Sequence, residues 1–359
     1  MTRPARAWLS APALLNNLQR VRHYAPQAKV MAIVKANGYG HGLAWVAKTL
    51  HSADGFGVAS VEEGASLRAL HVRQPICLLE GFFQADELPT LVSMRLEPVI
   101  HHIRQLSDLE QAAGIGSLDV WLKIDTGMHR LGFAPDAVAG VLQRLQACPN
   151  VGAIKLMTHF ANADNKFDAT TRVQTDLFLQ LSKGASMARS LANSAAVVAW
   201  PASHLEWVRP GIMLYGASPM IGQSAETLGL QPVMTLQTEI IAIHQRRKGE
   251  VVGYGGDFVC PVDMPVGVAA IGYGDGYPRH APTGTPVLVG SKRLPLIGRV
   301  SMDMITLDLR LRPHTRIGDP VVLWGRGLPA EEIAEHTGTI AYELFCCVTQ
   351  RVPRVSQDN

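Results

Sequence analysis

The sequence has few aromatic residues and little charge of either sign. Aromatic residues make up 6% and charged residues 18% of its 359 residues, and the formal net charge is +3. It contains neither a long run of Lys and Arg nor a basic segment interleaved with aromatic residues, so no nucleic-acid partner is expected. No apolar run reaches the ~18 residues that a membrane span requires, and the first residues are too polar for a signal peptide. We therefore expect no membrane association and a cytoplasmic location.

Cysteine is scarce, and its distribution argues against two kinds of site. The cysteines are odd in number and include no C-x-x-C pair; they are Cys77, Cys148, Cys260, Cys346 and Cys347. Neither a disulfide framework nor a zinc or other metal site is therefore expected, and a reducing compartment fits best.

Hydrophobic residues, by contrast, make up 47% of the chain, and in its first two-thirds they gather in short continuous runs. Such runs are typical of parallel strands buried on both faces. Amphipathic segments separate them, one after Ser10 and another after Ser60, where Glu63 suggests a capping box. The eight runs are Val30–Lys35, Phe56–Ala59, Ile76–Leu79, Glu97–Ile100, Val120–Ile124, Ile154–Thr158, Met187–Ala192 and Trp207–Leu214. They predict an α/β fold with a (β/α)₈ barrel domain over residues 1–230, although a doubly wound sheet would show the same alternation.

After residue 230 the pattern changes to segments in which apolar and polar residues alternate, with Gly and Pro between the segments. This pattern predicts a C-terminal β-rich domain over residues 231–359, with one helix near its end at Ala330–His336. The candidate strands are Val233–Ile243, Val251–Tyr254, Val266–Gly272, Thr285–Val289 and Met304–Leu309.

A lysine ends the first buried strand. The segment from Ile33 to Gly42 reads IVKANGYGHG, and burying the Lys35 ammonium without compensation would be costly. A lysine tolerates such a place when it is neutral or engaged in a Schiff base. The glycines that follow let the backbone approach a ligand, and active sites of barrels lie at the carboxyl ends of strands. From these residues alone, a surface lysine beside a flexible loop is an equally good interpretation.

The same segment resembles the cofactor-lysine motif of the alanine racemases, which are pyridoxal-phosphate enzymes of fold type III. Further segments resembling motifs of that family follow in the same order along nearly the whole chain. They are LKIDTGMHRLG at 122–132, MTHF at 157–160, ANSA at 192–195, RPGIMLYG at 209–216, VGYG at 252–255, GYGDGY at 272–277 and GRVSMD at 298–303. One such match arises readily by chance, whereas this many in register are specific.

The resemblance implies that Lys35 binds pyridoxal 5′-phosphate as a Schiff base. It also implies a set of phosphate ligands, namely Tyr39, Ser194 and the backbone amides of Gly211 and Ile212. Barrels often bind phosphate in the loops after strands seven and eight, and backbone N–H groups are natural anion donors. Without the family, Ser194 would be interpreted as part of a helix cap, which is compatible with phosphate binding.

Arg209 matches the residue that faces the pyridine nitrogen in this family. Because arginine keeps its proton, that nitrogen is implied to stay unprotonated, which makes the ring a weaker electron sink and favours reprotonation at Cα. His159 matches a histidine that links Arg209 to the opposite catalytic tyrosine. Without the family, Arg209 would be interpreted as a surface salt-bridge partner and His159 as a structural residue.

Racemisation requires proton transfer on both faces of one carbon, and therefore two acid–base groups. The resemblance implies Lys35 for the α-proton of the D-enantiomer and Tyr254 for that of the L-enantiomer. Since an unperturbed tyrosine has a pKa of ~10, Tyr254 is expected to need help from a cationic chain through His159 and Arg209. In the family this tyrosine reaches the barrel of the other subunit, so a head-to-tail homodimer with composite sites is implied.

The matched substrate-binding residues favour a small amino acid. Arg130 matches the ligand of the substrate carboxylate, which suits its forked donors, and Met302 together with Tyr254 is expected to narrow the pocket. Lys123 matches a position reported as carbamylated in relatives, where the new anion would orient Arg130. Its plainer interpretation is a surface ladder with Asp125.

One position departs from the family. Many members place a tyrosine that reaches the phosphate just before an Arg-Val-Pro segment, whereas this chain has Gln350 there. A phosphate contact from that position is therefore not expected.

The predicted function is pyridoxal-phosphate-dependent interconversion of L-alanine and D-alanine. The nearest alternative is a broader racemase for serine or basic amino acids; such relatives are often exported, and no signal peptide is evident. A non-catalytic pyridoxal-phosphate-binding barrel is disfavoured because those proteins lack a β-rich domain. A decarboxylase of the same barrel type is expected to carry an acidic residue where Arg209 stands, and a cysteine motif that this chain does not match.

Overall fold

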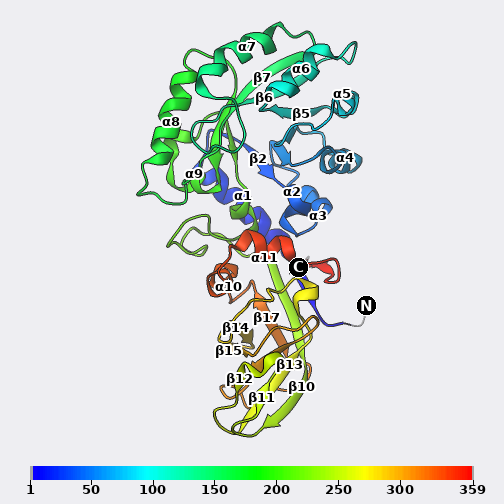
Figure 1. Cartoon of the computed structure of the whole chain (residues 1–359), viewed down its shortest axis with the longest axis vertical. Helices are drawn as coiled ribbons and strands as arrows, with labels where there is room; N and C mark the ends of the chain where they lie inside the picture. The colour runs from blue at the N-terminus through cyan, green and yellow to red at the C-terminus, as the bar shows by residue number, and fades with distance from the viewer. Residues whose placement is uncertain (1–2, 358–359) are drawn as a thin grey trace.

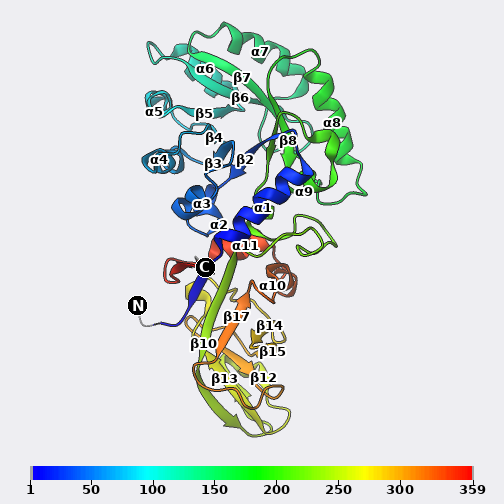
Figure 2. The ribbon, with the colours of Figure 1, turned by 180° about the vertical axis from the view of Figure 1, so that it is seen from behind.

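The computed structural model describes residues 3–357. A barrel surrounded by helices and a domain built mainly from strands are joined end to end along the long axis of the molecule (Figure 1; Figure 2 from behind). Within the described residues no helix is both long enough and apolar enough to cross a membrane, and all five cysteines are free thiols.

Eight parallel strands close into a barrel, which confirms the predicted (β/α)₈ fold and rules out the doubly wound sheet. Each strand pairs with the next along the chain, and the last, β9, pairs with the first, β2. Every predicted run overlaps one of these strands, which are β2 (Lys29–Ile33), β3 (Gly55–Val58), β4 (Ile76–Leu78), β5 (Leu96–Ile100), β6 (Leu118–Lys123), β7 (Val151–Met157), β8 (Arg189–Asn193) and β9 (Trp207–Arg209).

The predicted helix starts after Ser10 and Ser60 are confirmed. The Ser10 hydroxyl accepts a hydrogen bond from the Ala13 amide, and the Ser60 hydroxyl accepts one from Glu63. The Glu63 carboxylate, however, accepts from the amide of Ala59 instead of closing the predicted box on Ser60. The helical segments of the barrel are α1 (Ala11–Tyr24), α2 (Lys35–Tyr39), α3 (Leu43–Thr49), α4 (Val61–Ala69), α5 (Leu88–Met94), α6 (Ile103–Gln111), α7 (Val138–Ala147), α8 (Thr170–Leu181) and α9 (Ser194–Ala199).

The last barrel strand is shorter than the predicted run Trp207–Leu214. It ends at Arg209 because Pro210 has no N–H to contribute to the ladder, and Ile212–Tyr215 then form a short 3₁₀ turn. The carboxyl end of β9 and the turn after it therefore carry several of the predicted site residues.

The second body is an eight-stranded sheet with the order β13-β16-β15-β14-β17-β10-β1-β18, accompanied by a β11–β12 hairpin. The predicted strands overlap β10, β11, β13, β14 and β16, and the predicted helix overlaps α10. Its elements are β1 (Arg6–Leu9), β10 (Met234–Arg246), β11 (Val251–Val252), β12 (Phe258–Val259), β13 (Met264–Ala269), β14 (Pro286–Val289), β15 (Lys292–Ile297), β16 (Ile305–Asp308), β17 (Pro320–Trp324), α10 (Ala330–Thr337), α11 (Ala341–Cys347) and β18 (Arg354–Ser356).

Two elements at the junction of the bodies were not predicted. Strand β1 pairs with β10 and β18, so the first strand of the chain lies in the second body, although residues 1–230 were assigned to the barrel domain. Helix α11 lies between the two bodies (Figure 1) and contacts α2 of the barrel. The C-terminal part of the chain therefore reaches the segment that begins with Lys35.

Candidate active site

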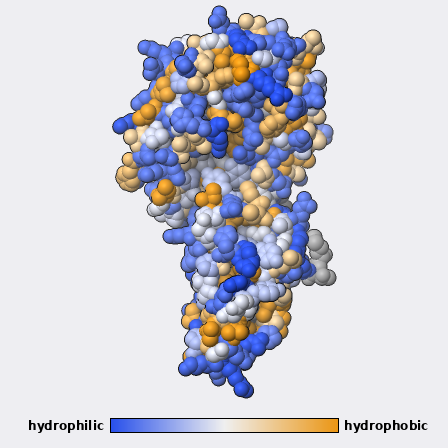
Figure 3. Space-filling model, viewed as in Figure 1, coloured by the Kyte–Doolittle hydropathy of each residue, from blue (hydrophilic) through white to orange (hydrophobic). Residues whose placement is uncertain are grey.

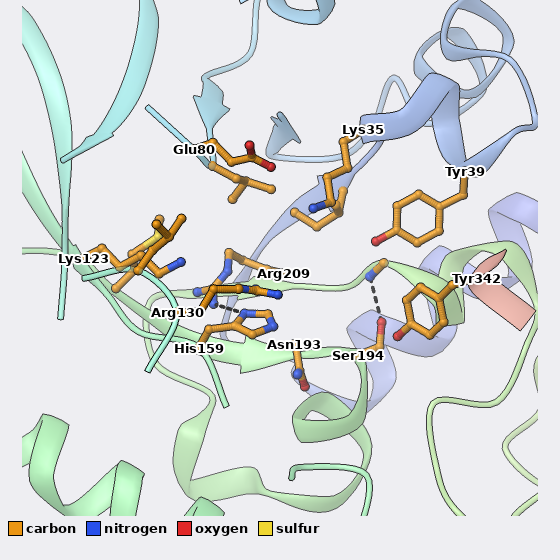
Figure 4. A pocket seen from close by; sticks show the side chains of 15 residues that line it. Lys35, Tyr39, Glu80, Lys123, Arg130, His159, Asn193, Ser194, Arg209 and Tyr342 are labelled. Carbon is orange, nitrogen blue, oxygen red and sulfur yellow. Dashed lines mark hydrogen bonds between the residues drawn. The ribbon is translucent and has the colours of Figure 1, made fainter. Parts of the chain in front are cut away.

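A cavity of about 490 Å³ contains most of the residues that the sequence nominated. Lys35 and Tyr39 contribute to its wall from one segment, and Arg130, His159 and Ser194 from three others (Figure 4). They converge because barrel strands bring their carboxyl ends together. The full lining is Ile33, Lys35, Tyr39, Leu79, Glu80, Lys123, Arg130, Leu131, Met157, His159, Asn193, Ser194, Arg209, Gly211 and Tyr342.

The segment after Lys35 is a left-handed turn. Residues 36–40 have φ angles of 53°, 56°, 62°, 49° and 73°, and each non-glycine residue in that conformation costs about 1–2 kcal/mol. Because a left-handed turn mirrors the usual helix, side chains four positions apart still project to the same side. Figure 4 shows Lys35 and Tyr39 both reaching into the cavity. Strain of this kind is retained where surrounding contacts hold it, typically at functional sites.

Hydrogen bonds from Asn37 brace this turn. Its side-chain oxygen accepts from the amide of Leu43 at 2.8 Å, and its own amide donates to the Glu63 carboxylate at 3.4 Å. Asparagine tolerates left-handed backbone better than most residues because its short side chain bonds locally. The turn is therefore built from local contacts as well as from glycine.

A cradle for an anion lies beside Tyr39. The Ser194 hydroxyl accepts from the Gly211 amide at 2.7 Å and from the Met213 amide at 3.4 Å, and Ile212 lies between these two amides. A Cβ atom on Gly211 would come within 2.6 Å of the Tyr39 hydroxyl oxygen, so a larger residue there would have to displace Tyr39. Burial raises the pKa of Tyr39 above its ordinary value and keeps it a hydroxyl donor. Hydroxyls and backbone amides of this kind suit a phosphate group.

Arg209 is buried at the base of the cavity, which excludes the surface salt-bridge interpretation. Its guanidinium donates to the Thr158 carbonyl at 2.5 Å, to the Ser190 hydroxyl at 2.6 Å and to the Leu191 carbonyl at 3.3 Å. Burial lowers the pKa of Arg209 to about 10, which leaves it charged at neutral pH. It also approaches Nδ1 of His159 at 3.4 Å.

That contact determines the tautomer of His159. Arginine only donates, so Nδ1 of His159 accepts, and in the neutral ring the hydrogen then resides on Nε2. Burial and the nearby Arg209 charge hold the pKa of His159 well below its ordinary value, so the ring is neutral. His159 therefore offers an Nε2–H donor to the cavity.

Lys123 is 8% exposed and lies among cations. Burial, followed by the charges of Arg209 and Arg130, lowers its pKa to about 8. The surface ladder with Asp125 is therefore wrong. That carboxylate instead accepts hydrogen bonds from the amides of residues 127–129, and so shapes the loop that leads to Arg130.

Tyr254 and Met302 do not line this cavity. These residues are 68% and 53% exposed, and both lie between strands of the second body. Tyr254 follows β11, which lies toward the far end of that body from the barrel (Figure 1). Val251 and Val259, which pair with each other in the β11–β12 hairpin, are also exposed, and Figure 3 shows hydrophobic residues on the surface near this end of the second body.

The cavity also contains a tyrosine that the sequence did not nominate. Tyr342, on α11, lines it, and its ring centroid lies 5.8 Å from that of Tyr39. Gln350, which stands where many family members have a tyrosine, is exposed and does not line the cavity. The tyrosine that the C-terminal part of this chain contributes to the cavity is Tyr342. The unpredicted helix α11 explains why Tyr342 was missed. Glu80, the one acidic residue lining the cavity within the described chain, was missed as well.

Comparisons with known proteins agree with this architecture. A family model for the alanine racemase N-terminal domain matches residues 9–219, and one for the C-terminal domain matches residues 233–356. An alanine racemase from Nitrosococcus oceani is 52% identical over 98% of this chain and 99% of its own, and one from Vibrio cholerae is 52% identical over 97% of each. The crystal structure of a biosynthetic alanine racemase from Pseudomonas aeruginosa matches with a TM-score of 0.97 and 46% identity, covering 99% of this chain and 100% of that one. With the barrel, the cavity and both domain models in agreement, the chain belongs to the alanine racemase family.

Proposed function

We propose that the chain interconverts L-alanine and D-alanine with pyridoxal 5′-phosphate bound at Lys35. The observation that carries this proposal is the convergence of Lys35, the anion cradle at Ser194 and the buried Arg209 on one cavity. When bound, pyridoxal phosphate withdraws electrons from an attached amino acid and makes its α-hydrogen acidic. The residues fit this group, since an amine, phosphate donors and a donor for a ring nitrogen surround one space.

The phosphate would be held by the cradle. Its donors are the hydroxyls of Tyr39 and Ser194 and the amides of Gly211 and Ile212, and Tyr342 lies close enough to join them. Each of these groups is uncharged, so fixed dipoles rather than a lysine or arginine bind the phosphate.

Arg209 would donate to the pyridine nitrogen. The hydrogen bonds that it donates to Ser190, Thr158 and Leu191 fix its orientation, and its charge at neutral pH keeps that nitrogen unprotonated. With that nitrogen unprotonated, the bound group would withdraw electrons from Cα less strongly, which would favour the return of a proton over other reactions at that carbon.

Two bases would then exchange protons at Cα. The Lys35 amine takes the α-proton of D-alanine on one face, and the hydroxyl of Tyr254 from a second copy of the chain gives a proton to the other face. The L-to-D reaction runs in reverse. The Nε2–H of His159, oriented by Arg209, stabilises negative charge on the Tyr254 oxygen.

A second copy is required because Tyr254 lies outside the cavity of its own chain. Its 68% exposure, together with the exposed apolar side chains of Val251 and Val259 on the neighbouring hairpin, suits a contact with another molecule. The expected assembly is a head-to-tail homodimer in which each β-rich domain completes the cavity of its partner.

Arg130 would bind the substrate carboxylate, and Met302 of the second copy would narrow the space at the β-carbon. With its pKa lowered to about 8, the Lys123 amine is nucleophilic enough to add carbon dioxide. An N–C bond forms and one proton is released, which leaves a carbamate that can accept hydrogen bonds from Arg130. The modification would replace the buried Lys123 cation with an anion beside Arg130.

A chiral assay together with one absorbance spectrum tests the proposal. A yellow protein that drives L-alanine to equal amounts of both enantiomers, and acts much more slowly on L-serine, supports it. A yellow protein that leaves both amino acids unchanged refutes the racemase function, and equal rates on the two substrates refute the preference for alanine.

A further inference from the structure

His41 is a fully buried titratable residue that none of the steps above uses. Its side chain is 0% exposed, and its Nδ1 atom lies 2.7 Å from the carbonyl oxygen of Tyr39. Burial lowers its pKa to about 4, so the ring is neutral at physiological pH. Because a carbonyl only accepts, Nδ1 carries the hydrogen and donates it.

The surroundings of the second ring nitrogen indicate that the Nδ1–H donor is what position 41 requires of its side chain. Nε2 of His41 is buried and has no hydrogen-bond partner within residues 3–357. An unpaired buried polar atom destabilises the folded state, and an apolar side chain of similar size would avoid that penalty. The feature of His41 that such a side chain would lose is the Nδ1–H donated to Tyr39.

The rings of His41 and Tyr39 share a support. Each packs against the ring of Tyr215 with a centroid distance of 4.7 Å. The Tyr215 hydroxyl in turn donates to the carbonyl of Ile33 in β2 at 2.9 Å. Tyr215 is thus fixed to the barrel, and both ends of the segment from Tyr39 to His41 rest on it.

The C-terminal helix α11 closes this assembly from the other side. The rings of Phe345 and His41 pack nearly perpendicular with their centroids 5.2 Å apart, and a Cβ atom on Gly40 would lie only 2.0 Å from the Phe345 carbonyl oxygen. Arg354 donates to the Gly40 carbonyl at 3.0 Å. The same helix carries Tyr342 into the cavity, so the left-handed turn and α11 pack as one unit.

We propose that His41 is a positioning residue: its Nδ1–H holds the Tyr39 carbonyl, keeps the left-handed turn from relaxing, and thereby sets the Tyr39 hydroxyl and α11 for phosphate binding. The proposal rests on the function proposed above for Tyr39. Without the donor, the non-glycine residues of the turn regain their preference for right-handed or extended backbone. Tyr39 then turns away from Gly211, and the cradle loses a donor.

Three substitutions separate this role from general destabilisation. His41→Asn retains a side-chain N–H near the Nδ1 position, whereas His41→Leu fills a similar volume without a donor. Leu145→Ala, at a fully buried residue of α7 away from the turn, creates a cavity and serves as the matched control. The readouts are the dissociation constant of pyridoxal phosphate from the holoenzyme, the circular dichroism of the cofactor band and the melting temperature.

His41→Leu is expected to raise the dissociation constant about tenfold, the scale of one lost hydrogen bond, and to change the dichroism. His41→Asn is expected to stay close to the unmodified protein. Leu145→Ala is expected to lower only the melting temperature. If His41→Leu does not fold, His41→Gln replaces it, because the longer side chain carries its amide past the Tyr39 carbonyl and should lose affinity where asparagine does not.

Two results would overturn the role of His41. One is an unchanged affinity and dichroism in the leucine or glutamine variant, and the other is an equal loss of affinity in the asparagine variant. An unmodified protein that binds no pyridoxal phosphate at all would overturn the proposed function, and the role of His41 with it.

Discussion

The hydroxyl of Tyr39 occupies the space that a side chain at residue 211 would need. A Cβ atom on Gly211 would lie 2.6 Å from that hydroxyl oxygen, far inside van der Waals contact. The left-handed turn and the end of β9 are thereby fitted to each other, although 172 positions separate them in the sequence (211 − 39).

Gly211→Ala should displace Tyr39 and weaken cofactor binding. We expect the dissociation constant of pyridoxal phosphate to rise about tenfold or more, because at least one phosphate donor is lost. An absorbance titration measures it. Gly140→Ala in α7 is the matched control, since nothing lies within 4 Å of its Cβ position; it should bind normally and gain about 0.5–1 kcal/mol of stability. Equal affinity in both variants would show that the fit at Gly211 is not required.

Lys35→Ala should abolish the yellow colour of lysine-linked pyridoxal phosphate and all racemisation. Lys35→Arg retains a positive charge but has no amine able to form the linkage, so it should also lack the absorbance band of the lysine-linked cofactor. A visible spectrum and a chiral assay measure the two effects. An arginine variant that keeps the band of the linked cofactor would place the covalent attachment elsewhere.

The sequence indicates the barrel well because its strands are buried on both faces and read as continuous apolar runs. The motifs also nominate the residues that converge at the carboxyl ends of those strands, such as Arg209 and His159. The left-handed turn could not be predicted, because Ala36, Asn37 and Tyr39 are not glycine and their backbone is held by distant contacts. Likewise, β1 is only four residues long, and its partners lie more than 200 residues away in the chain (234 − 9 = 225).

Acid should destabilise the protein in part through His41. Its pKa is about 4 when folded, against 6.5 ordinarily, so between these values the unfolded chain binds more protons. The free energy of unfolding therefore falls as the pH drops from 6.5 towards 4, by at most about 3 kcal/mol from this group. The groups facing the ring are the Arg354 guanidinium and the Tyr215 and Phe345 rings.

Urea unfolding of the unmodified protein and of His41→Asn at several pH values in this window measures that contribution. The variant lacks the titrating group and should show a shallower dependence on pH. Superimposable pH dependences would mean that His41 titrates alike in both states, contrary to its burial.

Lys123 should carry a carbamate when carbon dioxide is present. With ¹³C-labelled bicarbonate, the carbamate gives a ¹³C NMR signal that should grow as the pH approaches about 8, where burial and the charge of Arg209 leave the amine half deprotonated. The signal should vanish in Lys123→Arg. It should persist in Lys155→Arg, because the Lys155 ammonium is held in an ion pair with Glu97 at 2.7 Å. Absence of the signal from the unmodified protein throughout this pH range would contradict the modification.

The composite site is tested most directly by mixing two inactive variants. Lys35→Ala and Tyr254→Phe each remove one of the two bases, so each homodimer should racemise alanine very slowly. If the bases come from different chains, a hybrid dimer has one site with both lesions and one intact site. Co-refolding equal amounts should then restore about a quarter of the unmodified rate, since half of the dimers are hybrids with half of their sites intact. A mixture no more active than the separate variants would show that Lys35 and Tyr254 do not meet across subunits.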